Sequence, residues 1–134
     1  EGVPKASSGT IDLPIADDYE SGKRHIARDD DEPSRHAVTH YRVKERFPRG
    51  ALLEVELDTG RQHQIRLHLR AIGHPIVGDG VYGSKEQTTG TRPFLHACKL
   101  AFPHPLTGQP IDCESDPPRD FAAALQRLRG AGAR

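Results

Sequence analysis

Residues 59–75 carry the pattern of a helix with a start and an end signal. They read Thr59-Gly60-Arg61-Gln62-His63-Gln64-Ile65-Arg66-Leu67-His68-Leu69-Arg70-Ala71-Ile72-Gly73-His74-Pro75. Ile65, Leu69 and Ile72 recur at helical spacing, which predicts a helix over residues 62–72 with these three side chains facing a core. Thr59 and Gln62 fit a capping box at its start. Gly73 suits the position just after a helix, and Pro75 prevents its continuation.

The chain before this helix alternates with the period of β-strands. Residues 37–45 and 51–57 are predicted strands, and the turn at residues 47–50 predicts that they form an antiparallel hairpin. In the second strand Leu53, Val55 and Leu57 share one face, with glutamates on the other. Residues 9–15 are a further, short strand candidate. Residues 16–36 contain almost no apolar side chains, and we predict an exposed or disordered loop there.

After the helix, residues 73–93 are rich in Gly and Pro and predict a long loop, of a length that is often functional. Residues 95–102 and 111–114 predict two more strands around a turn. A final amphipathic helix follows Pro117-Pro118 and carries Phe121, Leu125 and Leu128 on one face. The predicted fold class is α+β, a mostly antiparallel or mixed sheet with two short helices in one domain over residues 1–134.

The composition restricts the class of protein. Of the 134 residues, 34% are hydrophobic and 28% charged, and no apolar run could span a bilayer. No signal-peptide pattern is present, so we expect no membrane partner and a cytoplasmic location. The two cysteines, Cys98 and Cys113, flank the second hairpin and are expected to be reduced thiols. The chain has no Met and opens with Glu1-Gly2-Val3-Pro4, from which we expect a piece of a longer protein.

Charge is unevenly distributed although the net charge is zero. Residues 12–32 hold eight acidic side chains against three basic ones, whereas residues 59–111 hold six basic side chains against two acidic ones. A basic centre favours an anionic partner such as RNA. Metal chemistry is not indicated, because His63 and His68 are five residues apart and neither cysteine has a close second ligand. Phosphate-loop and dinucleotide-binding fingerprints are also lacking.

Several motifs occur together in one order: Thr59-Gly60-Arg61, His63-Gln64-Ile65-Arg66, Ile72-Gly73-His74-Pro75, Gly78-Asp79, Tyr82-Gly83, Leu95-His96-Ala97 and His104-Pro105. In this order and spacing they resemble the C-terminal half of the catalytic domain of RluA-type RNA pseudouridine synthases. Residues 37–41 resemble the strand that enters this half. The resemblance covers nearly the whole chain, and several ordered motifs are far more specific than one.

The resemblance implies an enzyme that isomerises uridines of structured RNA, ribosomal or transfer RNA, to pseudouridine without a cofactor or a metal. The family's catalytic aspartate lies in an Arg-Leu-Asp motif upstream of the matched region, and the chain contains no such motif. We therefore expect the N-terminal half of the domain to be missing and this chain alone to be inactive. The alternative is an RNA-binding or purely structural half-domain without catalysis.

The resemblance also assigns two residues, and the remaining candidates below follow from their residue types and positions. Arg66 corresponds to the arginine that pairs with the catalytic aspartate, where a guanidinium would hold the carboxylate ionised and oriented. Leu95 corresponds to an apolar wall of the uracil pocket, which would replace the stacking that a flipped base loses. Asp79 and Tyr82 would shape the rim of the substrate pocket, although a turn-making role for Asp79 is slightly favoured. Arg61, His63 and Arg70 would contact phosphates, but an internal hydrogen-bonding role is the commoner one for His63 and His68.

Overall fold

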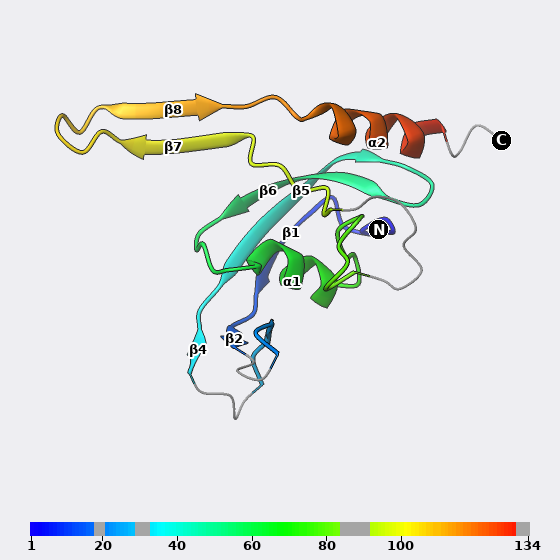
Figure 1. The fold of residues 1–134 in the computed structure, drawn as a ribbon, viewed down its shortest axis with the longest axis horizontal. Helices are drawn as coiled ribbons and strands as arrows, with labels where there is room; N and C mark the ends of the chain where they lie inside the picture. The colour runs from blue at the N-terminus through cyan, green and yellow to red at the C-terminus, as the bar shows by residue number, and fades with distance from the viewer. Residues whose placement is uncertain (18–20, 29–32, 84–91, 131–134) are drawn as a thin grey trace.

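The computed structural model describes residues 1–17, 21–28, 33–83 and 92–130. Its main sheet has the order β1-β5-β6 and is antiparallel, with β1 at Ser8–Asp12, β5 at Val38–Arg46 and β6 at Ala51–Leu57. The turn between β5 and β6 is closed by the Phe47 amide, which donates to the Gly50 carbonyl at 2.8 Å. The predicted hairpin is thus confirmed, and Figure 1 shows the sheet near the middle of the molecule.

The segment predicted as an exposed or disordered loop at residues 16–36 is largely exposed where the structure describes it, but it contains short strands. Three short strands form a second antiparallel sheet of order β3-β2-β4: β2 at Ile15–Asp17, β3 at Arg24–Ile26 and β4 at Ser34–Arg35. Ile15 is buried in a cluster with Ala37, Leu67 and Tyr82, and Ile26 packs against it. Contacts with α1 and with the loop after it therefore order a segment whose own composition is polar. Residues 18–20 and 29–32 lie outside the described residues.

Helix α1 spans Gln64–Ala71. The capping box predicted from Thr59 and Gln62 is wrong, because His63 is the N-cap, in a left-handed conformation and without a side-chain cap. The side chain of Gln64 bridges the entry instead: its Oε1 accepts from the Thr59 hydroxyl at 2.7 Å and from the Arg61 amide at 3.0 Å. The predicted C-terminal end is confirmed, because Gly73 has φ +85° and donates to Arg70, while the next amide donates to Leu69.

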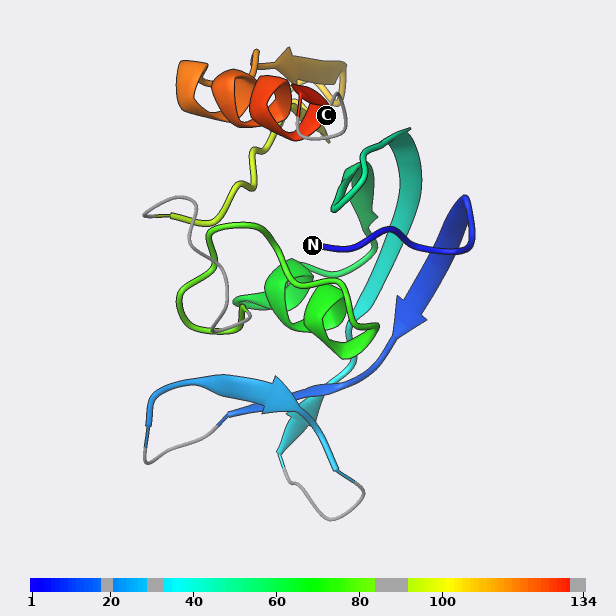
Figure 2. The same cartoon turned by 90° about the vertical axis from the view of Figure 1, so that its right-hand side faces the viewer.

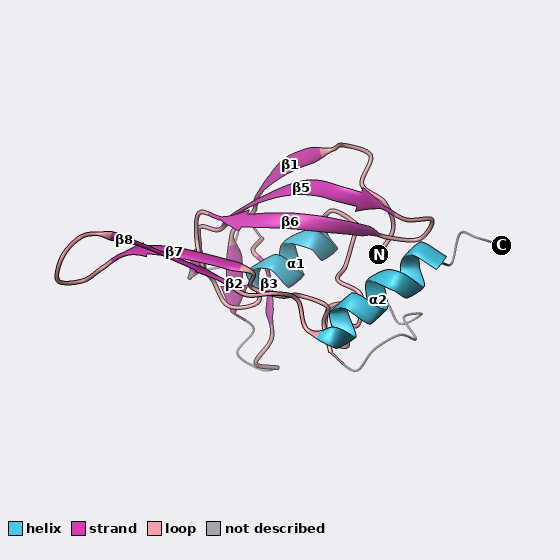
Figure 3. Cartoon of the chain, turned by 90° about the horizontal axis from the view of Figure 1, so that it is seen from above, coloured by secondary structure: helices cyan, strands magenta, loops and turns pink. Residues whose placement is uncertain are grey.

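Helix α1 lies against one face of the β1-β5-β6 sheet (Figure 3) and between the small sheet and α2 (Figure 2). Leu69 is buried with Ile11 of β1 and Ile76 of the following loop, and Ile65 and Ile72 pack against this cluster. The three predicted core positions of the helix are therefore confirmed. Leu67 is also buried, on the side that faces the small sheet, so α1 is covered on two sides.

The remaining elements form what we call the C-terminal arm, residues 92–130. It contains the antiparallel hairpin of β7 (Lys99–Pro103) and β8 (Pro110–Glu114), followed by helix α2 at Arg119–Gly130. The strand predicted from residue 95 begins only at Lys99. Both cysteines are free and exposed, as expected for thiols. Residues 73–83 and 92–93 contain no helix or strand, in agreement with the predicted loop, whereas residues 84–91 lie outside the described part.

The mostly antiparallel α+β architecture with two helices agrees with the predicted fold class. Among the described residues, no helix has the length and apolar character needed to cross a membrane.

Candidate functional site

The helix places Arg66 beside the loop that follows it, where the guanidinium meets Asp79. Two parallel hydrogen bonds join them, from Nε to Oδ2 and from Nη2 to Oδ1, each 2.8 Å long. The Asp79 side chain is only 1% exposed and that of Arg66 18%. Such a two-pronged contact fixes the plane of the guanidinium as well as its position, which a single contact to a lysine would not do.

Asp79 is also the centre of a turn, because its Oδ1 accepts from the backbone amides of Val81 and Tyr82, both at 3.0 Å. Burial alone would raise the pKa of this carboxyl. The hydrogen bonds from Arg66 and from the two amides outweigh burial and lower the pKa of Asp79 to about 2. The hydrogen bonds that Arg66 donates to Asp79 likewise raise the pKa of Arg66. The pair is therefore ionised at neutral pH, and the turn-making role favoured for Asp79 is confirmed.

Tyr82 covers the pair from the side. The Arg66 guanidinium carbon lies 4.9 Å from the centre of the Tyr82 ring, a cation–π contact. The Tyr82 hydroxyl accepts from the backbone amide of Arg24 in β3 at 3.1 Å. Asp79 and Tyr82 are both buried and support Arg66 from within, and their predicted place at the rim of a substrate pocket stays a prediction.

His63 stands at the edge of the same cluster. Its Nδ1 lies 2.9 Å from the Tyr82 hydroxyl, and the two rings meet edge to face. Burial lowers the pKa of His63, and the positive charges of Arg66 and Arg24 lower it further. A neutral imidazole attracts a phosphate less than a charged one does, so His63 is better suited to hydrogen bonding than to neutralising RNA.

The other predicted positions lie apart from this cluster. Arg61 is exposed, and its Nε donates to the His36 carbonyl at 2.9 Å. Arg70 is exposed on the last turn of α1. Leu95 precedes the arm hairpin and lines an apolar cleft beside β6. The structure therefore brings Arg66, Asp79, Tyr82 and His63 into contact, whereas Arg61 contacts His36, Arg70 is exposed and Leu95 lines the cleft.

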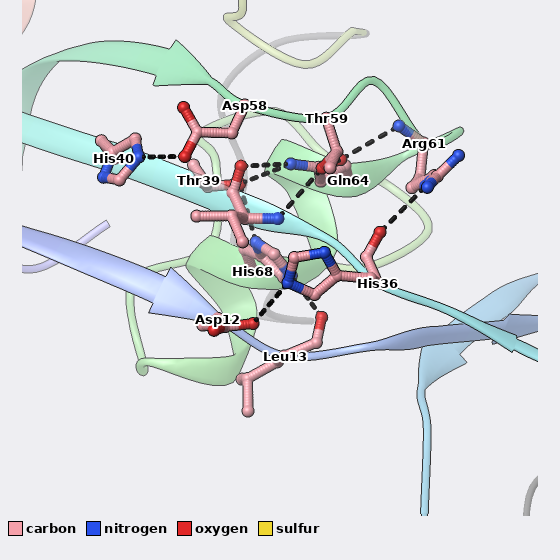
Figure 4. Close-up of polar contacts among 11 residues, drawn as sticks. Asp12, Leu13, His36, Thr39, His40, Asp58, Thr59, Arg61, Gln64 and His68 are labelled. Atoms are coloured by element: carbon pink, nitrogen blue, oxygen red, sulfur yellow. Dashed lines mark hydrogen bonds and ion pairs between the residues drawn. The ribbon is translucent and has the colours of Figure 1, made fainter.

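A buried polar network lies on the opposite side of α1 (Figure 4), and of its members only His68 was expected from the sequence to have an internal role. His68 has no exposed surface, and its Nε2 donates to the Leu13 carbonyl at 2.8 Å. A carbonyl oxygen only accepts, so Nε2 carries a proton, and in the neutral imidazole Nδ1 then accepts from the Thr39 hydroxyl at 2.7 Å. The internal role expected for His68 is confirmed.

Gln64 extends this network to β5. Its Nε2 donates to the Val38 carbonyl at 2.9 Å and to the Thr39 hydroxyl at 3.0 Å. The Thr59 hydroxyl, which donates to Gln64, accepts in turn from the Val38 amide at 3.0 Å. None of the buried side-chain nitrogen or oxygen atoms in the described part of the chain lacks a partner. The network thus fixes α1, and with it Arg66, against the sheet.

Arg24 is the other contributor that sequence reasoning missed, because it lies in the segment predicted to be a loop. Its side chain donates from Nε and Nη2 to the Gln62 Oε1 at 3.1 and 2.7 Å, and it pairs with Asp17. The small sheet is thereby attached to the entry of α1. Within the described ranges, no group of three or more His, Cys, Asp or Glu side chains could hold a metal ion.

The sequence that forms this framework matches a known protein family. The sequence model described as RNA pseudouridylate synthase matches residues 3–71, more than half of the chain. The chain belongs to the RNA pseudouridine synthase family. The matched residues include β1, β5, β6 and α1, so the family signature coincides with the framework that positions Arg66.

Curated relatives of this pseudouridine synthase chain support an RluA-type member. An uncharacterized RNA pseudouridine synthase of Mycobacterium bovis is 42% identical over 98% of the chain and 43% of its own length. Ribosomal large subunit pseudouridine synthase D of Nitrosomonas europaea is 42% identical over 90% of the chain and 37% of its own length. The chain thus spans less than half the length of these relatives.

Two solved structures show the same fold. Human RNA pseudouridylate synthase domain containing 4 superposes with a TM-score of 0.71 and 28% identity, over 96% of this chain and 59% of that one. Human RNA pseudouridylate synthase domain containing 1 gives a TM-score of 0.75 over 96% of this chain and 62% of that one. At 24% identity, the second structure is evidence for the fold alone.

Proposed function

We propose that this chain is the C-terminal part of an RNA pseudouridine synthase that converts uridine to pseudouridine within structured RNA. In this isomerisation the bond from ribose to N1 of uracil breaks, the base turns, and a new bond joins the ribose to C5. The proposal is carried by one observation: the family signature coincides with a rigidly held arginine at a partly exposed position.

Arg66 is proposed to hold the catalytic aspartate, which the remaining part of the domain would supply. Asp79 occupies Nε and Nη2, and among the described residues no partner contacts Nη1. A guanidinium held on its inner side by one carboxylate can present its third nitrogen to a second carboxylate. That contact would keep the nucleophile ionised and aimed.

Leu95 is proposed to wall the uracil pocket. It is partly exposed and lines an apolar cleft, which suits an apolar surface for a base taken out of its stack. The exposed Arg61 and Arg70 are proposed to contact phosphates on either side of α1. A relative named for the ribosomal large subunit favours ribosomal RNA as the substrate class.

Tritium release from RNA labelled at C5 of uracil tests the proposal, because rejoining through C5 displaces the hydrogen there. The assay compares this chain alone with a chimera in which it replaces the matching part of the Mycobacterium bovis relative. We expect release by the chimera and none by the isolated chain. Failure of a folded chimera that binds RNA would overturn the proposed function. Release by the isolated chain would show that a nucleophile lies within these 134 residues.

Variants of the chimera test Arg66. Arg66→Ala and Arg66→Lys are both expected to lower kcat at least a hundredfold while RNA affinity changes little. Arg70→Ala, one helical turn further on, is the matched control and should raise KM with kcat unchanged. Normal turnover by either Arg66 variant would refute its proposed role.

A further inference from the structure

His63 has an unusual backbone conformation at the entry of α1. Its φ is +58°, and among the described residues it is the only one other than glycine with a positive φ. This left-handed conformation brings the Cβ of an L-residue close to the following carbonyl oxygen, so it is strained unless the surroundings hold it. A residue at this position usually caps the helix with its side chain, yet His63 forms no such bond. The strain therefore accompanies a different contact of the imidazole.

That contact is with Tyr82, and it determines the tautomer of His63. Tyr82 is buried and its hydroxyl oxygen accepts from the Arg24 amide, so the hydroxyl proton needs an acceptor of its own. In the described part of the chain, the only acceptor within reach is Nδ1 of His63, 2.9 Å away. A neutral imidazole that accepts at Nδ1 carries its proton on Nε2. His63 therefore presents an Nε2–H donor.

The charged groups around His63 keep the ring neutral. Burial has the largest effect and lowers the pKa of His63, and the positive charges of Arg66 and Arg24 lower it further. The negative charge of Asp79 acts in the opposite direction and is the smallest of these influences. The ring is partly exposed, and its Nε2 forms no hydrogen bond with any residue that the structure describes. A neutral N–H donor is thus available to a bound molecule.

Tyr82 places this donor next to the proposed active-site arginine. The centre of its ring lies 5.4 Å from that of His63 and 4.9 Å from the guanidinium carbon of Arg66. His63 and Arg66 are three residues apart, so they lie on the same side of the helix entry. Both side chains are partly exposed, whereas the tyrosine between them is buried. A neutral donor and a cation are therefore held side by side at one surface.

We propose that the Nε2–H of His63 donates a hydrogen bond to a carbonyl oxygen of the uracil and stabilises the negative charge that the base acquires during isomerisation. When the bond from ribose to N1 breaks, its electron pair stays with the uracil, because C5 must afterwards attack the ribose carbon as a nucleophile. The charge spreads from the ring nitrogen to the two carbonyl oxygens. A donor that is already in place stabilises such charge, and a neutral imidazole N–H can serve as that donor. His63 keeps its proton in this step. The inference rests on the proposed function and adds a catalytic residue to it.

Two amide replacements separate this role from a structural one. In His63→Gln the side-chain nitrogen takes the place of Nε2 and keeps a donor, whereas in His63→Asn the side-chain oxygen takes the place of Nδ1 and keeps the acceptor for Tyr82. In the chimera with the Mycobacterium bovis relative, we expect His63→Asn to lower kcat about a hundredfold with little change in KM, and His63→Gln to lower it about tenfold. A residue that only holds Tyr82 would give the reverse order, and that order would overturn the inference. Thermal melts of both variants show that each is folded.

Sulfur substitution in the substrate tests the contact itself. Transcripts of large-subunit ribosomal RNA are made with uridine, 2-thiouridine or 4-thiouridine, each tritiated at C5, and tritium release is measured. Sulfur is a weak hydrogen-bond acceptor. The wild-type chimera should lose about tenfold in kcat on one of the two sulfur-containing transcripts, and His63→Asn less than about twofold on the same transcript, because its contact is already absent.

The outcomes distinguish this inference from the function on which it rests. Equal sulfur effects in wild type and His63→Asn would overturn the role of His63. Turnover of uridine RNA that neither His63 variant changes would also overturn that role and leave the proposed function intact. A folded wild-type chimera that binds the uridine transcript but releases no tritium would refute the proposed function and the inference with it.

Discussion

The two helices of this chain are similarly amphipathic but have very different surroundings. Helix α1 buries Gln64, Leu67, His68 and Leu69 between two sheets, whereas α2 buries only Ala124. Apolar residues at helical spacing indicate only that one face of the helix needs to be buried against other residues. Whether the cover lies in the same chain depends on the tertiary structure. Residues of the same chain bury the apolar face of α1, whereas the apolar face of α2 borders a cleft.

Replacing one leucine by alanine on each helix should give the largest difference in unfolding free energy between two variants. Leu69→Ala removes a buried side chain from the cluster with Ile11 and Ile76 and should cost about 3 kcal/mol of unfolding free energy. Leu125→Ala should cost less than about 1 kcal/mol in the isolated chain, because its side chain faces the open cleft. Urea denaturation measures both values. Equal losses would show that α2 is as well packed as α1.

The second largest loss of stability is expected from the buried hydrogen-bond network of His68 and Thr39 beside α1. His68→Ala leaves a cavity and deprives the Leu13 carbonyl and the Thr39 hydroxyl of their partner, which should cost about 2–3 kcal/mol. His36→Ala is the control, since that side chain is exposed, and we expect a change of less than about 0.5 kcal/mol. Similar melting temperatures for the two variants would contradict the importance of the network.

Acid should weaken the Arg66–Asp79 pair in a defined interval. The folded pKa of Asp79 is about 2, against 3.8 for the unperturbed group. Its contribution is therefore present above pH 4 and is lost as the pH falls towards 2. The difference corresponds to about 2 kcal/mol of unfolding free energy. Unfolding free energies measured from pH 5 to pH 2 should show this loss in wild type, and Asp79→Asn should lack that part of it.

The smallest effect is expected at the attachment of the arm. Arg129→Ala removes the two hydrogen bonds of 2.8 Å to Glu45, but both side chains are at the surface. The loss of stability should be small and should disappear at high salt. Thermal melts at two salt concentrations measure it. A large loss that persists at high salt would mean that this ion pair is what holds α2 in place.

Much of the framework was predictable because it depends on local pattern. The β5–β6 hairpin follows from alternation around a turn, and the end of α1 follows from Gly73 and the proline behind it. The ordered motifs led to the pseudouridine synthase family, which the comparisons show independently. The motifs also singled out Arg66, although its catalytic role stays a prediction.

Other features depend on contacts between distant residues, which local pattern does not contain. The small sheet forms because Ile15 and Ile26 pack beside Leu67 and Tyr82, so a polar segment became strands. The partner of Arg66 is Asp79, thirteen residues further on, and the motifs did not indicate that pairing. The start of β7 was predicted four residues too early, because strand pairing with β8 begins only at Lys99.

Local propensity and motif order therefore determine the elements and the family, since both are properties of neighbouring residues. Long-range packing determines which polar groups meet, which carboxyl has a low pKa and which apolar faces stay open, since these depend on residues brought together by folding.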